Sequence, residues 1–438
     1  MLEARSLAEP GLQAYLERQM GRSLPAWPPA RLDLEALTLV AFYFLPSLEL
    51  ARAEWAVAEA GVTTAGGRPN PVLTAGPGYN FSVGAGGPTP WIPFANLDLP
   101  LETAGKRGHR VARAKELAEA ARLRLSTVAW KVREQLHANL LEHAAATARA
   151  ERLRAQQRIQ EKMLALLEQR VEAGAAARTE MSPVRIALLK TGLDLAAAVR
   201  QAEASRVALA GSLGLPVRAL EGVAFDLDVS TSPKTDPSLT APEARQRALT
   251  SRSDVLGALA EYAASQSALQ LEVARQYPDL HLGNGYQYDQ GEHKWTLGLS
   301  AELPVFNRNQ GPIAEAEARR QAQAVRVLAL QARIIADVDG ALAAWSNALE
   351  QAAKQSQVRL LAAEQAETVA ALVNAGAADA LELAGAQLEA AATDLAQQDA
   401  LVSVHRAGAQ LEAALQRPIP TWPAPEPGRN AQLRKGQP

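Results

Sequence analysis

The fold is decided by two neighbouring stretches, YPDLHLGNGYQYD at residues 277–289 and WTLGLSAEL at residues 295–303. Apolar residues largely recur at every second position in both stretches, and small or polar residues lie between them. The apolar sides carry Leu280, Leu282, Tyr286 and Tyr288 in the first stretch and Trp295, Leu297, Leu299, Ala301 and Leu303 in the second. A period of two residues predicts two strands, each with one apolar and one wet face.

The first half of the chain repeats this pattern and its surroundings. One expected strand has Leu73, Ala75, Tyr79, Phe81 and Val83 on one side, and the next has Leu97, Leu99 and Leu101. Other landmarks recur in the same order: Leu99-Pro100-Leu101 with Leu303-Pro304-Val305, Ala173-Gly174-Ala175-Ala176 with Ala375-Gly376-Ala377-Ala378, and Leu213-Gly214-Leu215-Pro216 with Leu415-Gln416-Arg417-Pro418. We interpret the chain as one duplicated helix-and-hairpin unit rather than an array of short repeats.

Each expected strand is roughly ten residues long, about the length that a tilted strand needs to cross a bilayer. Aromatic residues near the strand ends are typical of membrane interfaces, which suggests this role for Tyr79, Phe81, Trp91, Phe94, Tyr286, Tyr288 and Trp295. A half-buried sheet of a soluble protein uses the same alternation, so the strands alone leave both interpretations open. Four strands cannot close a membrane barrel, and the membrane interpretation therefore requires an oligomer, with three copies supplying twelve strands.

The helical stretches are longer than an ordinary domain uses. Residues 112–171 contain no Pro or Gly, and residues 313–374 contain only Gly340. In the second stretch, 3-4 spacing predicts a coiled-coil seam of Ile335, Val338, Leu342, Trp345 and Leu349. In the first, the expected apolar face is Leu117, Ala121, Leu125, Val128, Val132, Leu136 and Leu140. Each helix should end at a Gly-Ala tip, Gly174 or Gly376, and a return helix should follow.

These boundaries predict five segments. They are an N-terminal segment (1–30), a first repeat (31–220), a linker (221–240), a second repeat (241–418) and a flexible tail (419–438). The first repeat has a preceding helix at about 34–65, a β-hairpin at about 72–102 and a tip near 174; the second has a helix at about 242–276, a hairpin at about 279–305 and a tip near 376. The expected fold is mostly α, with long antiparallel helical hairpins and a small β part.

Composition excludes several classes of protein. Cysteine is absent, so disulfides and thiolate metal sites are excluded, and the net charge of -2 gives no basic field for nucleic acid. No run of 18 apolar residues marks a membrane helix, and residues 1–20 lack the apolar core of a signal peptide. The six histidines show no close paired spacing, so no metal site is expected, and no cofactor or nucleophile–base arrangement indicates an enzyme.

Two short motifs have ordinary explanations. The run Gly84-Ala85-Gly86-Gly87 lacks the Gly-Lys-Ser/Thr of a phosphate loop and falls between expected strands. The basic cluster at residues 105–110, GKRGHR, follows a strand and either faces anionic headgroups or caps the strand-to-helix junction.

Taken together, the order of elements resembles the TolC family of outer-membrane efflux channels over about residues 31–420. The most specific segments are RPNP at 68–71, YPD at 277–279 and LPVFNRNQG at 303–311, the last of which resembles the heavy-metal (CzcC and CusC) branch. The resemblance implies a homotrimer in which the strands form a twelve-stranded transmembrane barrel and the helical hairpins form an α-barrel in the periplasm. It also implies a periplasmic adaptor, an inner-membrane RND transporter and contact with outer-membrane lipid.

In such a channel the hairpin tips would meet the adaptor and gate the duct. The residues concerned are Arg170, Glu172, Gly174, Arg178, Asn374, Gly376, Asp379 and Glu382. The function expected is therefore a passive exit duct, for heavy-metal cations. Two alternatives stay open: a soluble periplasmic coiled-coil scaffold, which the missing signal peptide favours, and the duct of a type I secretion system.

Overall fold

The computed structural model describes residues 5–24, 27–233 and 240–418. Its chain divides into two compact units, each built from both halves of the sequence. The sheet unit comprises Leu50–Ser126 and Ser253–Ala332, and the helical unit comprises the described parts of Met1–Glu49, Thr127–Arg252 and Arg333–Pro438. The sequence repeats are therefore not the compact units. The tail expected at 419–438 lies outside the described residues.

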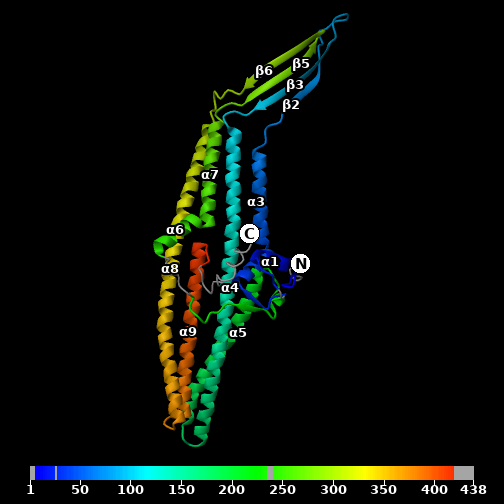
Figure 1. Ribbon diagram of the computed structural model, residues 1–438. Helices are drawn as coiled ribbons and strands as arrows, with labels where there is room; N and C mark the ends of the chain where they lie inside the picture. The colour runs from blue at the N-terminus through cyan, green and yellow to red at the C-terminus, as the bar shows by residue number, and fades with distance from the viewer. Residues whose placement is uncertain (1–4, 25–26, 234–239, 419–438) are drawn as a thin grey trace, which may run out of the picture. The chain divides into compact units, whose positions relative to one another are not determined.

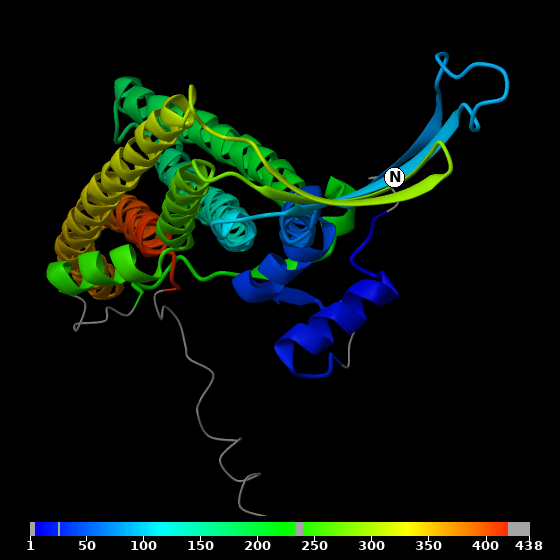
Figure 2. The ribbon, with the colours of Figure 1, turned by 90° about the horizontal axis from the view of Figure 1, so that it is seen from above.

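The sheet unit is built around four antiparallel strands in the order β2-β3-β5-β6 (Figure 1). Their bounds are β2 Val72–Tyr79, β3 Trp91–Leu101, β5 Leu280–Asp289 and β6 Glu292–Ala301. The two hairpins expected from the sequence pair with each other through β3 and β5. The sheet is a curved band (Figure 2), and β2 and β6 are its open edges.

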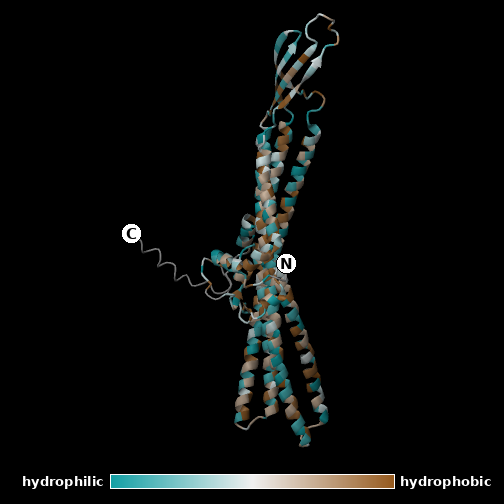
Figure 3. Ribbon diagram, turned by 90° about the vertical axis from the view of Figure 1, so that its right-hand side faces the viewer, coloured by the Kyte–Doolittle hydropathy of each residue, from teal (hydrophilic) through white to brown (hydrophobic). Residues whose placement is uncertain are grey.

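The register gathers the apolar positions of all four strands on one face. Leu73 pairs with Leu97, Leu99 with Leu282, and Leu282 with Leu299. Paired residues point to the same side of an antiparallel sheet, so these side chains form one largely apolar face, which Asn284 of β5 interrupts. The alternation is visible as hydrophobic and hydrophilic bands along the strands (Figure 3).

Four helical segments complete the sheet unit. They are α3 (Pro46–Ala65), α7 (Ser253–Ala274) and the first parts of α4 (Lys106–Glu172) and α8 (Gln310–Asn374). Polar contacts join α7 to its neighbours, since Glu261 binds Arg124 of α4 and Gln323 of α8. The expected long helices thus exist, with 67 residues in α4 and 65 in α8.

The helical unit holds the remaining elements. Its helices are α1 (Pro10–Met20), α2 (Leu34–Phe44), α5 (Met181–Leu213), α6 (Ala241–Ser251), α9 (Ala380–Leu415) and the later parts of α4 and α8, with short η2 (Arg178–Glu180) and η3 (Val217–Leu220). Its largest core brings α1, α2, α4 and α5 together through Leu12, Leu37, Leu136 and Leu209, all fully buried. Two short strands, β1 (Arg31–Asp33) and β4 (Ala224–Asp226), pair in parallel.

Several expectations about helices and linkers are corrected. The helix expected at 34–65 breaks at Leu45, because the following Pro46 disfavours the helical conformation there. The helix expected at 242–276 breaks at Arg252, whose backbone is extended and whose side chain donates to Ala414 O. The expected linker contains β4, because Ala224–Asp226 finds a distant strand to pair with.

The seam expected along α8 is only partly correct. Val338 and Trp345 are buried as expected, but the other buried positions are Ile334, Ala341, Ala348 and Ala352. Three of these buried positions are alanines, and the larger Leu342 and Leu349 beside them are only partly buried. On α4, Leu117 of the expected apolar face is exposed.

Among the described residues, no single helix has the length and apolar content to cross a membrane; α2 and α3 pass this test only together, as a bent pair.

Candidate functional site

The apolar face of the sheet is exposed in the single chain. Leu73, Leu297 and Leu299 are 69%, 77% and 66% exposed. An exposed apolar face of this extent marks a surface that lipid or another protein covers. The helices of the sheet unit do not cover it.

Aromatic side chains gather on this face at the end that carries both hairpin turns. Tyr79 and Trp91 pair across β2 and β3 with ring centroids 5.0 Å apart. Tyr286 and Trp295 pair across β5 and β6, also at 5.0 Å. Tyr288 lies beside His293 at 5.1 Å. The register therefore places five of the seven aromatics singled out from the sequence in one band.

The other two aromatics lie outside the strand positions of this band. β2 ends at Tyr79, so Phe81 and Val83 lie in the loop between strands rather than on the strand face as expected. The Phe81 ring nevertheless extends the band, because its centroid is 4.9 Å from that of Tyr79. Phe94 lies on the opposite face, where its ring is 3.5 Å from the position of a Cβ on Gly76. The Phe94 side chain is directed to the wet face, and its contact with Gly76 covers part of the ring.

The wet face carries polar groups among glycines. His281 Nδ1 lies 2.9 Å from Asp98 Oδ2, and Lys294 Nζ lies 2.8 Å from Asp289 Oδ2. Gly283, Gly285 and Gly298 occupy the positions between them on this face. The face is therefore polar and has little side-chain bulk.

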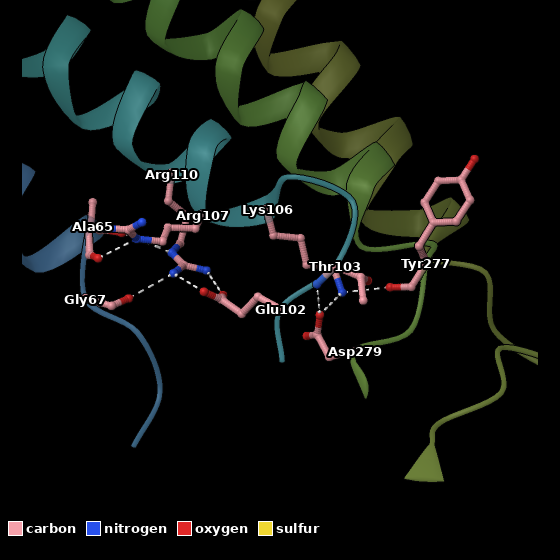
Figure 4. A network of polar contacts seen from close by, with 10 residues as sticks. Ala65, Gly67, Glu102, Thr103, Lys106, Arg107, Arg110, Tyr277 and Asp279 are labelled. Carbon is pink, nitrogen blue, oxygen red and sulfur yellow. Dashed lines mark hydrogen bonds and ion pairs between the residues drawn. The ribbon is translucent and has the colours of Figure 1, made fainter. Parts of the chain in front are cut away.

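At the junction of sheet and helices, a network of charges is satisfied internally (Figure 4). Lys106, only 7% exposed, donates to Tyr277 O at 2.7 Å and to Asp279 Oδ1 at 2.8 Å. Arg110 binds Glu102, with Nη2 3.0 Å from Oε2, and Arg107 donates to Gly66 O. Three cations of the basic cluster therefore cap this junction, which is the second of the two roles considered from the sequence.

The carboxylates of the junction are held in the charged state. The pKa of Glu102 is lowered by its hydrogen bonds with Arg110, which outweigh burial. For Asp279 burial acts to raise the pKa, but Lys106 and the Thr103 N–H together lower it below its ordinary value. Both carboxylates are thus ionised at neutral pH.

Both hairpin tips end their long helices in the same way. Gly174 and Gly376 have positive φ, 70° and 74°. The next N–H reaches back five residues, from Ala175 to Arg170 O and from Ala377 to Leu372 O, both at 2.8 Å. This is the Schellman ending, which glycine favours because it has no Cβ. After the second tip, helix α9 begins at Ala380, with Asp379 as its N-cap.

The structure brings together three of the eight tip residues singled out from the sequence, Arg170, Asp379 and Glu382. Arg170 at the end of α4 forms an ion pair with Asp379, which also accepts from the N–H groups of Leu381 and Glu382. These backbone bonds and Arg170 lower the pKa of Asp379. Glu172, Arg178, Asn374 and Glu382 are exposed at the two turns.

Sequence reasoning missed a ladder of ion pairs between α4 and α9. Besides Arg170–Asp379, its members are Glu142–Arg406, Arg149–Asp399 and Arg152–Asp394. Farther along, the buried Glu412 faces Arg133 and His137 of α4 at 3.8 and 3.4 Å. Basic residues of α4 and acidic residues of α9 follow one another in matching order along the two antiparallel helices. This order could have predicted the ion pairs, but only once the two helical hairpins were known to be neighbours.

Within the described ranges, no group of three or more His, Asp or Glu side chains has the arrangement of a metal site. His143 and His405 instead contact the backbone carbonyls of Ala202 and Thr231, and burial lowers the pKa of both. Gly84–Gly87 lies in the turn between β2 and β3 and precedes no helix, unlike a phosphate loop.

The fold with its two-faced sheet is similar to that of solved outer-membrane channels. The crystal structure of CusC matches with a TM-score of 0.69 at 19% identity, over 90% of this chain and 94% of CusC. VceC from Vibrio cholerae matches with a TM-score of 0.68 at 19% identity, over 87% of this chain and 95% of VceC. At 19% sequence identity, these similarities show a shared fold.

The sequence identifies the family. The model of the outer membrane efflux protein family matches residues 45–215 and 244–416, so the chain belongs to this family. CzcC, the cobalt-zinc-cadmium resistance protein of Cupriavidus metallidurans, is 27% identical over 224 residues, which are 51% of this chain and 52% of CzcC. The match thus spans about half the length of that relative. The expected location, the outer membrane with an extension into the periplasm, is confirmed by family and fold.

Proposed function

We propose that the chain is the passive exit duct of a tripartite efflux system and that its cargo is heavy-metal cations. The observation that supports the duct is the sheet with one apolar and one wet face, which we assign to lipid and to the lumen. Among the described residues, neither edge strand, β2 or β6, has a strand paired on its outer side. An exposed edge of this kind needs another strand to pair with.

A trimer satisfies these edges. Four strands per chain are too few, because membrane barrels use about eight strands or more. In three copies, β6 of each would pair with β2 of the next, and twelve strands would close the barrel. The aromatic band of Tyr79, Trp91, Tyr286, Tyr288 and Trp295 then lies at one membrane interface, as aromatic girdles do.

The direction of the sheet faces can be tested by a matched pair of substitutions. Leu297→Arg puts a charge on the apolar face, and we expect it to cost about 2–4 kcal/mol if that face meets the bilayer midplane. Thr296→Arg places the same side chain on the wet face of the same strand and should cost much less. Yield of heat-resistant oligomer from membranes measures both. Equal loss in the two variants would contradict the assignment of faces.

Heavy-metal cargo is supported by the likeness to CzcC, whose name specifies cobalt, zinc and cadmium resistance. We infer that the adaptor and an inner-membrane RND transporter supply the cargo and that the adaptor meets the hairpin tips. The membership in an efflux family does not favour a soluble scaffold, and the likeness to a metal-resistance protein favours metal over protein cargo.

Deletion of the gene in its own host tests the cargo. We expect deleted cells to accumulate cobalt, zinc or cadmium and to grow poorly in them, with both defects reversed by the plasmid-borne gene. Growth in detergents and dyes serves as the comparison. Unchanged metal content, together with a new sensitivity to organic compounds, would contradict the metal assignment while keeping the duct.

A further inference from the structure

On the wet face of the sheet, one histidine and one carboxylate from different strands are in contact. His281 lies on β5 and Asp98 on β3, with Nδ1 and Oδ2 2.9 Å apart. Their side chains are 42% and 33% exposed, so solvent reaches both. The residues are distant in sequence, and only the register between β3 and β5 brings them together.

The surroundings leave this pair open to a solute. Asp98 pairs across the strands with Gly283, and His281 pairs with Ser300. Asn96, two residues before Asp98 on the same face, has its Oδ1 3.8 Å from the position of a Cβ on Gly283. An amide oxygen and a hydroxyl therefore border the pair. Only a glycine stands opposite Asp98 on β5, and its neighbour on β2 is Val72, whose side chain is itself exposed.

Asp98 also differs from the other acidic groups of the sheet and its border. Asp289 and Glu292 share the ammonium group of Lys294 at 2.8 and 3.9 Å, and Asp279 is bound by Lys106. The partner of Asp98 is instead an imidazole nitrogen, and among the described ion pairs no lysine or arginine binds this carboxylate. Since imidazole is itself a metal ligand, the two side chains together offer a cation one nitrogen and one oxygen donor.

We propose that Asp98 and His281 form a transit site for a divalent cation of the zinc, cobalt and cadmium type on the wall of the duct. Imidazole nitrogen together with carboxylate oxygen suits these metals, whereas Mg²⁺ and Ca²⁺ prefer oxygen alone. The inference rests on the proposed function, because it needs the wet face to line the lumen.

The geometry requires little movement. A metal bound tetrahedrally at about 2.0–2.1 Å from Nδ1 and from Oδ2 holds these atoms about 3.3 Å apart. The present 2.9 Å separation reaches this value by small rotations of two partly exposed side chains when the metal replaces the shared proton. With two protein ligands and water in the other positions, the site binds weakly, as a conducting path requires.

The test is equilibrium dialysis of the full-length chain in detergent against CdCl₂ up to millimolar concentration. We expect His281→Ala to lose one weakly bound Cd²⁺ per chain, and Asp98→Asn to weaken the same site by about tenfold. Excess MgCl₂ should not displace the metal. His293→Ala is the matched control, because His293 lies on the apolar face, where Nδ1 is 2.7 Å from the Tyr286 hydroxyl.

Isotherms of His281→Ala and Asp98→Asn that superimpose on that of the wild type would overturn the transit site. An equal loss in His293→Ala would do the same, since it would indicate nonspecific binding. Circular dichroism checks the fold of each variant, and Asp98→Asn serves alone if His281→Ala does not fold. The particle mass of the same preparation tests the duct separately. A trimer without His281-dependent binding would contradict only the transit site, and binding by a monomer would contradict the proposed duct.

Discussion

The first and last turns of helix α4 both carry charges, yet the two clusters are built differently. At the first turn Lys106 is buried, and its contacts with Tyr277 O and Asp279 tie the start of α4 to the segment just before β5. At the last turn Arg170 and Asp379 form a single, partly exposed pair surrounded by unburied charges. Removing one partner of a buried pair leaves a charge without compensation, whereas an exposed pair contributes little. The first cluster is thus suited to a permanent joint and the second to a contact that opens.

The strongest test of this difference is the loss of Lys106. We expect Lys106→Met to cost about 2–3 kcal/mol, less than a fully buried pair because Asp279 is 37% exposed. Lys115→Met is the matched control, an exposed lysine of the same helix, and should be near neutral. Unfolding of the detergent-solubilised protein in guanidinium measures both. Equal midpoints would show that the junction is not a joint.

A smaller effect is expected from Glu102 in acid. Its pKa is lowered in the folded state, so its contribution is complete above its unfolded pKa of about 4.5 and is lost as the pH falls toward the folded value. Wild-type stability should therefore decline below about pH 4.5 more steeply than that of Glu102→Gln, by about 1 kcal/mol in total. Thermal unfolding from pH 7 to 3 measures the difference. Parallel curves would mean that the Arg110 pair does not stabilise the fold.

The tip pair should have the smallest effect on stability. Arg170→Ala and Asp379→Asn are expected to leave the unfolding midpoint close to that of the wild type, because the pair is exposed and Asn retains the N-cap of α9. If the pair holds the tips together, both variants should conduct more in planar bilayers than the wild type does. Glu172→Gln, an exposed neighbour, is the control. Unchanged conductance in both pair variants would remove Arg170 and Asp379 from the gate.

Local patterns predicted the elements well because their causes are local. The strand alternation, the helices without Pro or Gly and the two tip glycines reflect backbone preferences of neighbouring residues. The return helices expected after the two tips are present as α5 and α9, which end at the repeat landmarks Leu213 and Leu415.

Contacts between distant segments were out of reach of the same patterns. The register of β3 on β5 places His281 beside Asp98 and sends Phe94 to the wet face. No proline follows Arg252 to predict the helix break there, and the Arg252 side chain donates to the carbonyl of Ala414, far along the chain. Each of these features depends on which segments become neighbours, which periodicity does not encode.

The most direct test of the account is the mass of the particle extracted from membranes, corrected for bound detergent. The account predicts three times the 46.6 kDa of one chain, obtained only with detergent, because three sheets must join edge to edge to close a barrel. A monomer or dimer that is soluble without detergent would contradict it, since four or eight open-edged strands with an exposed apolar face would then be the native state.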